Sequence, residues 1–328
     1  MLIILNCIKC LESFEEGAKN PSPQTIRDRL LLDSTWLTDY HNSLWKIATF
    51  FVKRFHNKKW FISIDETYIP FFGKRKKLNE KLVKQGHGNL VFGYHADTPG
   101  ATGSFCFLVI SLCCDKIRIP IMIKMMKVGE KYEPWLKPNL EKLLKLSPKS
   151  IILADRGFGK SAWFYTMLDE MKAKYVVRAI LRKDEHKNKV ANGAKRFDNW
   201  IKDKETKEKT LITVRVEKDS QNRIYFLASN LDKKSNKEVL AIYLNRWDLE
   251  NIFKDTDRVE LKTSSTNPKM KFFSIIISFF IFTLWQVKRL QTIICSLRTF
   301  VKQIIETTCQ ILKIILTPLG VILPNPPD

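Results

Sequence analysis

The order of strand-like and helix-like segments between residues 60 and 180 constrains the fold of this chain more than any other feature. Three β-rich runs come first, and a helix, a short apolar strand, a second helix and a further strand follow in that order. The seven segments are Trp60–Tyr68, Asn89–His95, Ser104–Cys113, Tyr132–Leu146, Ser150–Ala154, Lys160–Lys172 and Tyr175–Ile180. Hairpins followed by βαβ alternation predict an α/β domain built on one mixed sheet with helices packed against it.

The sequence predicts three parts along the chain. Residues 1–58 place aromatic and aliphatic side chains at three- and four-residue intervals, so we expect a helical region that either binds DNA or packs on the main domain. Residues 59–290 form the main domain, in which the polar stretch at about 182–223 is a β-containing insertion. Helical segments at about 271–290 and 296–315 close the chain, and residues 291–328 are predicted to form a helical tail.

The charge balance indicates a polyanionic partner. The 328 residues include 56 Lys and Arg against 34 Asp and Glu, a formal net charge of +22. Nucleic acid and an anionic membrane surface both fit this excess. The most apolar run, Phe272–Trp285, is shorter than the ~20 residues that cross a bilayer, and serines interrupt it. We therefore expect a buried core helix there, no membrane partner, and nucleic acid as the polyanion.

The cysteines predict a reducing compartment. Seven cysteines are scattered without the spacing of a disulfide framework, which favours free thiols in a cytoplasmic protein. Cys7 and Cys10 form one CxxC pair, but no second Cys or His pair follows at zinc-ribbon distance. The N-terminus also lacks the basic leading segment and cleavage site of a signal peptide.

Two isolated aspartates lie on strand-like runs. Asp65 follows four β-prone residues in FISIDETY, and Asp155 follows the apolar run IILA, with Gly157 and Gly159 after it to form a tight turn. A lone aspartate after a strand is more often a turn or cap residue. Because strands hold their side chains rigidly, however, these two acids can converge although 90 residues separate them.

The segment YLNRWDLENIFK carries four polar residues at offsets of 0, 3, 7 and 11. On a single α-helix these offsets place Tyr243, Arg246, Glu250 and Lys254 on one narrow stripe. Surface ion pairs on an isolated helix have the same spacing. Together with the two aspartates and the basic balance, the stripe instead favours a surface that binds a metal ion and a phosphate group.

Three carboxylates on rigid elements suit Mg²⁺ or Mn²⁺, which prefer oxygen ligands. Two such ions ~3.5–4 Å apart could activate a water or a 3′-hydroxyl and stabilise the leaving oxygen of an in-line displacement. Arg246 and Lys254 lie one turn before and one turn after Glu250, where both could bind phosphates beside the scissile bond. The residues therefore predict metal-dependent phosphoryl transfer on DNA.

The chain resembles the DDE transposases of bacterial and archaeal insertion sequences. ILADRGF resembles the second-aspartate motif, and YLNRWDLENIFK resembles the Tyr-x2-Arg-x3-Glu signature. SIDETYIPFFGKRK resembles the first-aspartate strand and the basic stretch after it. The similarity spans about Trp60 to Lys288. It implies an RNase H-like mixed sheet flanked by helices, with a β-rich insertion before the final acid and helical segments at both ends.

The resemblance also implies roles for residues of this chain. The metal-binding triad would be Asp65, Asp155 and Glu250, holding two Mg²⁺ or Mn²⁺ ions, and Tyr243 and Arg246 would contact DNA beside it. The family usually has a Lys seven positions after the Glu, but this chain has Asp257 there. Lys254 or Lys262 would then replace that lysine.

Two further regions are predicted to contact DNA. Between Lys53 and Lys84 there are ten Lys or Arg and three acids, so Lys74, Arg75 and Lys76 are candidate contacts to the phosphate backbone. In the insertion, the resemblance suggests that Trp200 handles a flipped base at a hairpinned DNA end. The alternative is a Trp200 buried in the core of the insertion.

Taken together, the sequence predicts a transposase that cuts the terminal inverted repeats of its own element and joins the 3′-ends to target DNA. The resemblance implies a homodimer on paired ends of double-stranded DNA, in the cytoplasm and associated with the nucleoid of a prokaryote. An RNase H-like nuclease that cleaves without joining, and an inactive DNA-binding relic, are the alternatives. The intact triad argues against the relic.

Overall fold

The computed structural model describes residues 35–93, 98–115, 117–180, 193–203, 209–257 and 266–290, with single positions at Asn188 and Lys207. The chain divides into two compact units, Met1–Glu250 and Asn251–Asp328. The predicted CxxC pair, the segment at 296–315 and Lys262 lie outside the described residues. The predicted domain boundaries at 58/59 and 290/291 stay predictions.

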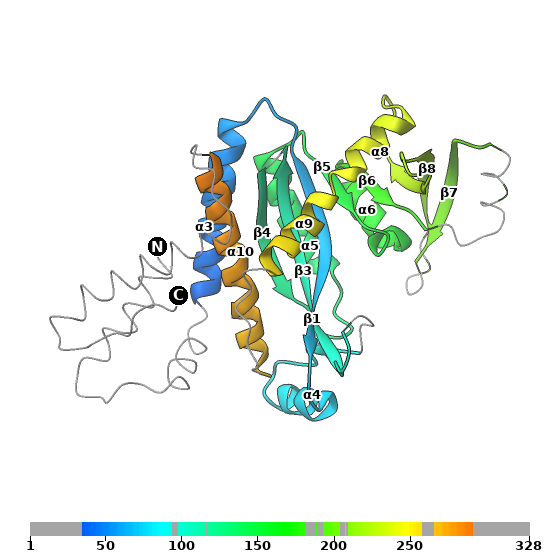
Figure 1. Ribbon diagram of the computed structural model, residues 1–328. Coiled ribbons are helices and arrows are strands. Elements are labelled where there is room, and N and C mark those ends of the chain that lie inside the picture. The colour runs from blue at the N-terminus through cyan, green and yellow to red at the C-terminus, as the bar shows by residue number, and fades with distance from the viewer. Residues whose placement is uncertain are drawn as a thin grey trace, which may run out of the picture. The chain divides into compact units, whose positions relative to one another are not determined.

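The described part of the first unit contains a nine-stranded mixed sheet (Figure 1). The strands are β1 Phe61–Phe71, β2 Val91–Phe92, β3 Gly103–Cys114, β4 Ile117–Met125, β5 Ile151–Ala154, β6 Lys174–Arg178, β7 Arg196–Lys202, β8 Lys209–Lys218 and β9 Ile224–Ser229. Their order is β2-β3-β1-β5-β6-β9-β8-β7, and β4 pairs with Phe107–Cys114 of β3, along the strand from the β2 pairing. Strand β1 is antiparallel to β3 and parallel to β5, which is parallel to β6. This arrangement confirms the predicted RNase H-like mixed sheet.

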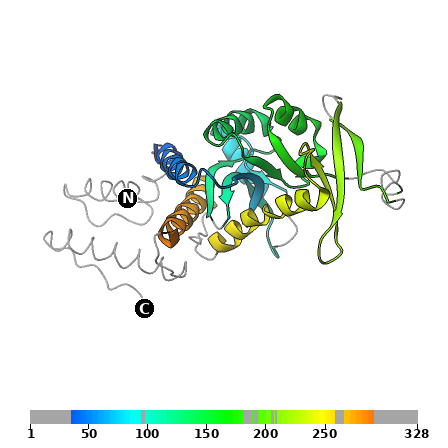
Figure 2. The ribbon, with the colours of Figure 1, turned by 90° about the horizontal axis from the view of Figure 1, so that it is seen from above.

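Helices cover both faces of this sheet. The described helices are α3 Thr35–Arg54, α4 Arg75–Lys84, α5 Glu133–Leu146, α6 Ala162–Glu170, α8 Asn236–Leu244, α9 Trp247–Asp257 and α10 Pro268–Leu290, with a 3₁₀ turn η1 at Phe158–Lys160. Seen from above, α5 and α6 lie on one face and α8 on the opposite face (Figure 2). At the centre of the sheet, Phe61–Ile64 of β1 and Ile151–Ala154 of β5 are buried.

Two elements of the first unit, strand β4 and helix α4, were not predicted. Strand β4 contains Pro120, a residue that usually argues against a strand. Here the strand lies at an edge of the sheet, and its pairing with β3 shifts register between Ile110 and Ser111. A proline is tolerated at such a position because no ladder hydrogen bond is lost. Helix α4 was missed because only Leu82 of its residues is buried, so it has no apolar periodicity.

The insertion continues the main sheet. Strand β8 contains the predicted ITVRVE strand and pairs antiparallel with both β7 and β9, and β9 pairs with β6. The polar stretch therefore supplies the outer strands of the same sheet (Figure 1). Of the predicted strand Asn89–His95, only Val91–Phe92 is strand in the described residues.

Helix α10 contains the predicted core helix of the C-terminal region. Ile276, Phe279 and Phe282 are buried on it, and the buried hydroxyl of Thr283 donates to the carbonyl of Phe279. By length and composition alone, Pro268–Arg289 could cross a membrane, with 44% of the apolar window buried. The core helix of a soluble protein satisfies the same two criteria, so this finding is weak evidence for a membrane span.

Candidate active site

The two aspartates lie side by side at the centre of the sheet. Strands β1 and β5 are parallel, and their register pairs Ile64 with Ala154. Asp65 and Asp155 follow these paired residues, so they occupy the same level on neighbouring strands, which lie about 4.8 Å apart. The parallel pairing thus brings together two acids that are distant in sequence, as predicted.

The turn after Asp155 is fixed by close packing. The carbonyl oxygen of Asp155 accepts hydrogen bonds from the N–H groups of Phe158 (3.1 Å) and Gly159 (3.3 Å). A Cβ at Gly159 would lie 2.0 Å from the carbonyl oxygen of Arg178 on β6, so only glycine fits there. At Gly157 a Cβ would meet nothing within 4 Å. Of the two glycines, Gly159 is therefore the one that the turn requires.

The predicted single helix at 236–257 is wrong, because it breaks between α8 and α9. Ser235 and Glu238 form a capping box that begins α8. The helix ends at Leu244, where the Asn245 side-chain amide donates to the carbonyls of Ala241 (2.9 Å) and Ile242 (3.1 Å). The Arg246 N–H then bonds to the carbonyl of residue 243, three positions back (2.9 Å). This tight turn still keeps the Tyr-Arg-Glu part of the predicted stripe together.

Arg246 connects the acids from two separate elements. Its Nη1 donates to Oδ2 of Asp65 (2.7 Å), its Nη2 donates to Oε1 of Glu250, and its Nε donates to the hydroxyl oxygen of Tyr243 (3.2 Å). The Tyr243 hydroxyl in turn donates to Oδ1 of Asp155 (3.4 Å). Arg246 is only 5% exposed. One buried guanidinium and one phenol thus link all three predicted acids.

Burial and like charges shift the pKa values in this cluster. Burial raises the pKa of Asp65 to about 6, and the charges of Asp155 and Glu250 add to the rise, while Arg246 opposes it. Burial by itself lowers the pKa of Arg246, but Tyr243 and the three carboxylates outweigh it and hold that pKa above its usual value. Burial raises the pKa of Tyr243 to about 12, so its hydroxyl stays protonated as a donor. The acids therefore lie close enough to repel one another.

The donor set fits a divalent cation by its chemistry. Carboxylate oxygens are the ligands that Mg²⁺ and Mn²⁺ prefer, and the three carboxylates outnumber the guanidinium that binds two of them. Among the residues that the structure describes, no three His, Cys, Asp or Glu side chains are arranged to hold a metal ion. Arg246 would have to release Asp65 or Glu250 before all three carboxylates could share one cation.

The predicted basic DNA contacts at the start of α4 lie away from the acids. Lys74, Arg75 and Lys76 are exposed at the start of α4, beyond the end of β1 (Figure 1). Asp65 lies six residues before the end of this strand, a distance of about 20 Å. Lys254 is exposed on α9 one turn after Glu250, in the second compact unit.

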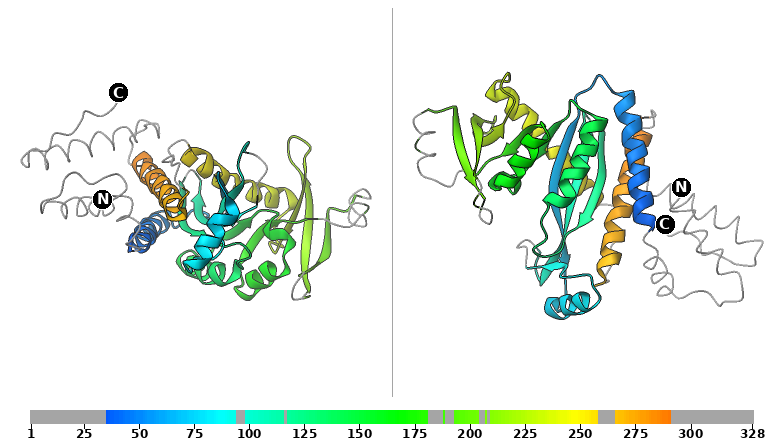
Figure 3. Two further views of the ribbon diagram at one scale, coloured as in Figure 1. Left: turned by 90° about the horizontal axis from the view of Figure 1, so that it is seen from below. Right: turned by 180° about the vertical axis from the view of Figure 1, so that it is seen from behind.

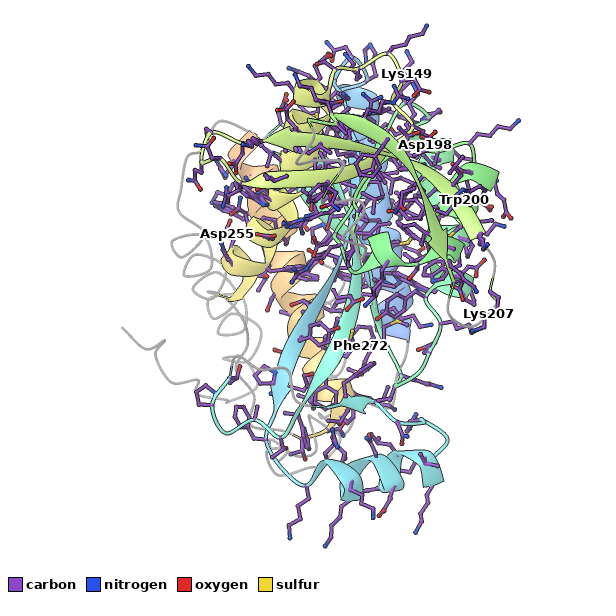
Figure 4. All side chains as sticks on the ribbon, turned by 90° about the vertical axis from the view of Figure 1, so that its right-hand side faces the viewer. Lys149, Asp198, Trp200, Lys207, Asp255 and Phe272 are labelled. Carbon is purple, nitrogen blue, oxygen red and sulfur yellow. The ribbon has the colours of Figure 1, made fainter. Side chains whose placement is uncertain are left out.

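Trp200 is exposed on the outermost strand of the sheet. It lies on β7, is 62% exposed, and is far from α4 (Figure 4). Four strand spacings separate β7 from β5, a distance of about 19 Å. Its exposure excludes the alternative of a tryptophan buried in the core of the insertion. The structure does not bring Trp200 to the acids.

Arg178 is a neighbour of the site that the sequence analysis missed. Its guanidinium lies over the ring of Tyr225 at 5.2 Å, and that ring packs against Tyr243 at 6.1 Å between centroids. Its charge also lowers the pKa of Tyr243, against the larger effect of burial. The sequence feature that could have indicated Arg178 is its position at the end of β6, the strand next to that of the second aspartate.

Comparison with known proteins identifies a family. Residues 56–280, about two thirds of the chain, match the family described as Transposase DDE domain. The matched region contains the three acids and the Tyr and Arg that link them. A search of curated proteins gave no significant match.

Proposed function

We propose that this chain, which belongs to the transposase DDE domain family, cuts DNA at the ends of its own element and joins the 3′-ends to target DNA. The family implies DNA binding and phosphoryl transfer. The single observation that carries the proposal is the link made by Arg246 and Tyr243 between acids from β1, β5 and α9. Acids that repel one another are held close where a cation can compensate them.

Asp65, Asp155 and Glu250 would hold Mg²⁺ or Mn²⁺, and two ions are proposed. Bound there, the metal would polarise the scissile phosphate and activate a water or a 3′-hydroxyl for in-line attack. The rigid strands position the two aspartates, and the Tyr243 hydroxyl orients the Asp155 carboxylate through its hydrogen bond. These residues therefore supply the ligands and their geometry.

Arg246 has a second proposed task. In the structure its guanidinium holds Asp65 and Glu250 together and offsets part of their charge. Its planar fork of donors also matches a phosphate. We propose that it transfers from a carboxylate to a DNA phosphate beside the scissile bond when metal and DNA bind.

Helix α4 is the proposed contact to more distant duplex DNA. Lys74, Arg75 and Lys76 begin a helix without an acid in its first turn and without a side-chain cap, so their charges oppose the helix dipole. Within the described residues, no cation of α4 has an ion-pair partner. A phosphate backbone about 20 Å or more from Asp65 would supply the missing anions. Lys254 and Trp200 are proposed as further DNA contacts.

The remaining proposals concern assembly and location. A homodimer on paired DNA ends and a cytoplasmic, nucleoid-associated location are proposed from the family alone.

The test of the function incubates purified protein with a labelled duplex of the element end, a target plasmid and Mg²⁺. We expect cleavage at the end and joined product. Cleavage without joining would overturn strand transfer and favour a nuclease. Binding without cleavage would overturn catalysis and favour an inactive relic.

A further inference from the structure

A polar cluster lies on the face of β1 opposite Asp65. Successive side chains of a strand alternate between faces, so Glu66 and Asp65 lie on opposite faces of β1, and Tyr132 at the start of α5 contacts Glu66. Helices α5 and α6 cover one face of the sheet (Figure 3). The Tyr68 hydroxyl donates to Oε2 of Glu66. The backbone N–H of Glu66 donates to Oδ1 of Asp65 (2.9 Å). The backbone that carries Glu66 thus also holds the first acid of the site.

Tyr132 connects this cluster to the second aspartate. It immediately precedes α5, and its hydroxyl interacts with the Glu66 carboxylate and the Cys106 thiol. Its ring packs against the buried ring of Phe158, with 5.9 Å between centroids. The Phe158 N–H donates to the carbonyl of Asp155 (3.1 Å). Tyr132 therefore contacts a residue that binds Asp65 and a residue that binds Asp155.

We infer that Glu66 and Tyr132 form a clamp behind the sheet that positions Asp65 and Asp155 for a shared divalent cation. Both are positioning residues, because neither reaches the face on which Arg246 and Glu250 lie. The role in cation binding rests on the proposed function. The clamp itself rests only on the contacts behind the sheet.

The chemistry of the cluster supports a positioning role. Burial raises the pKa values of Tyr68 and Tyr132 well above their usual value and that of Cys106 to about 12. All three groups therefore stay protonated at neutral pH, which leaves the thiol unsuited to act as a nucleophile. The Glu66 carboxylate lies among these buried groups, where it needs hydrogen-bond donors. These hydrogen bonds therefore fix the position of the Glu66 carboxylate.

Hydrogen exchange of single variants tests the clamp without any metal. Tyr132→Phe removes only the hydroxyl, and we expect faster exchange in residues 63–69 alone. Tyr132→Ala also removes the ring that packs on Phe158, so residues 155–160 should then exchange faster too. Tyr175→Phe is the control, because it removes the hydroxyl of another buried tyrosine of the sheet. It should leave the exchange of both segments unchanged. Unchanged exchange at 63–69 in Tyr132→Phe, or uniform acceleration across the protein, would overturn the clamp.

Direct Mn²⁺ binding, measured by the electron paramagnetic resonance signal of free Mn²⁺, tests whether the clamp positions the aspartates for a cation. Glu66→Ala and Tyr132→Phe should weaken binding by about 10-fold, as is common for residues that orient metal ligands. Glu66→Gln should lose less, because its amide oxygen still accepts hydrogen bonds, and Tyr175→Phe should bind like the wild type. Equal affinity in all variants would overturn the positioning role. A wild type that binds no Mn²⁺ would contradict the proposed function. The exchange data would still show whether Glu66 and Tyr132 form the clamp.

Discussion

The candidate active site and helix α4 are both highly charged, and they differ in how that charge is compensated. In the site, buried Arg246 forms ion pairs with Asp65 and Glu250. On α4, the cations are exposed and none of them has an ion-pair partner in the described residues. The difference indicates that charge in the site maintains the structure, whereas charge on α4 is available to an external anion.

Mutations in the two regions should therefore have different consequences. Removing one member of a buried ion pair leaves an uncompensated charge, which strongly destabilises a protein. Removing an exposed cation changes stability little, but it removes a contact to a polyanion and weakens the dependence of binding on salt.

The largest effect is expected for Arg246→Ala. Asp65 would lose its buried partner, so the free energy of unfolding should fall by about 3–5 kcal/mol. Urea denaturation measures this change. Arg196→Ala is the matched control, because Arg196 pairs with Asp232 at the surface and such pairs contribute about 0.2–1 kcal/mol. Equal small losses in the two variants would show that the site does not depend on its ion pairs.

The combined substitution Lys76→Gln, Lys77→Gln and Lys81→Gln on α4 should weaken DNA binding. Each lost phosphate contact reduces the slope of log K against log salt by about 0.9. Folding stability should stay the same or rise slightly, because Lys77 and Lys81 repel one another at i,i+4 spacing. Fluorescence anisotropy with a labelled duplex at several salt concentrations gives the slope.

The control for α4 replaces three exposed lysines elsewhere in the first unit, Lys145, Lys149 and Lys233. It removes the same charge and should leave the slope nearly unchanged. If both triple variants reduce the slope equally, net charge alone explains DNA binding, and α4 has no special role.

Trp200→Ala extends the comparison to an exposed apolar side chain. Because the ring is exposed, we expect stability within about 0.5 kcal/mol of the wild type. Binding to DNA with an unpaired end should weaken by about 1–3 kcal/mol through lost stacking. Leu211→Ala, at the cross-strand partner of Trp200, should leave binding unchanged. A loss of stability without a loss of binding would make Trp200 a structural residue.

The smallest effect concerns His41 on α3, a partly buried titratable group with the cation of Lys142 nearby. Burial lowers its pKa below the ordinary 6.5, the nearby Lys142 lowers it further, and a hydrogen bond to the backbone of Ile123 opposes both. The unfolded chain therefore binds the proton more tightly, and the wild type should lose stability as the pH falls below about 6.5.

His41→Gln should flatten this dependence, as thermal unfolding between pH 5 and 8 would show. The exposed His56 near the end of the same helix provides the control, and His56→Gln should keep the wild-type curve. Identical curves for all three proteins would contradict the predicted linkage.

The placement of Asp65 and Asp155 on strands could be predicted because the signals for it are local. Asp65 and Asp155 follow short apolar runs, and the register of the two parallel strands then places them side by side. The break between α8 and α9 could not be predicted in this way, because Asn245 and Arg246 tolerate a helix. Hydrogen bonds of the Asn245 side chain and the distant contact with Asp65 determine it.

Other features of the fold could not be predicted from the sequence for different physical reasons. Strand β4 was hidden by Pro120, which only its place at the sheet edge makes tolerable. Helix α4 has almost no buried face and is attached by Asn79, whose side chain bonds to the backbone of Leu90 and Val91. The contact between Glu66 and Tyr132 depends on the packing of α5 against the sheet, so no sequence spacing reveals it.

The central claim is that the three linked acids carry metal-dependent phosphoryl transfer. The most direct measurement compares Mg²⁺-dependent cleavage of an element-end duplex by the wild type, Asp155→Asn and Asp115→Asn. Asp115 lies in the β3–β4 turn with positive φ, a conformation that asparagine also adopts, so that control should fold and cleave normally. We predict that Asp155→Asn binds the duplex like the wild type and loses cleavage by about 10³-fold or more. Wild-type cleavage by Asp155→Asn would contradict the account.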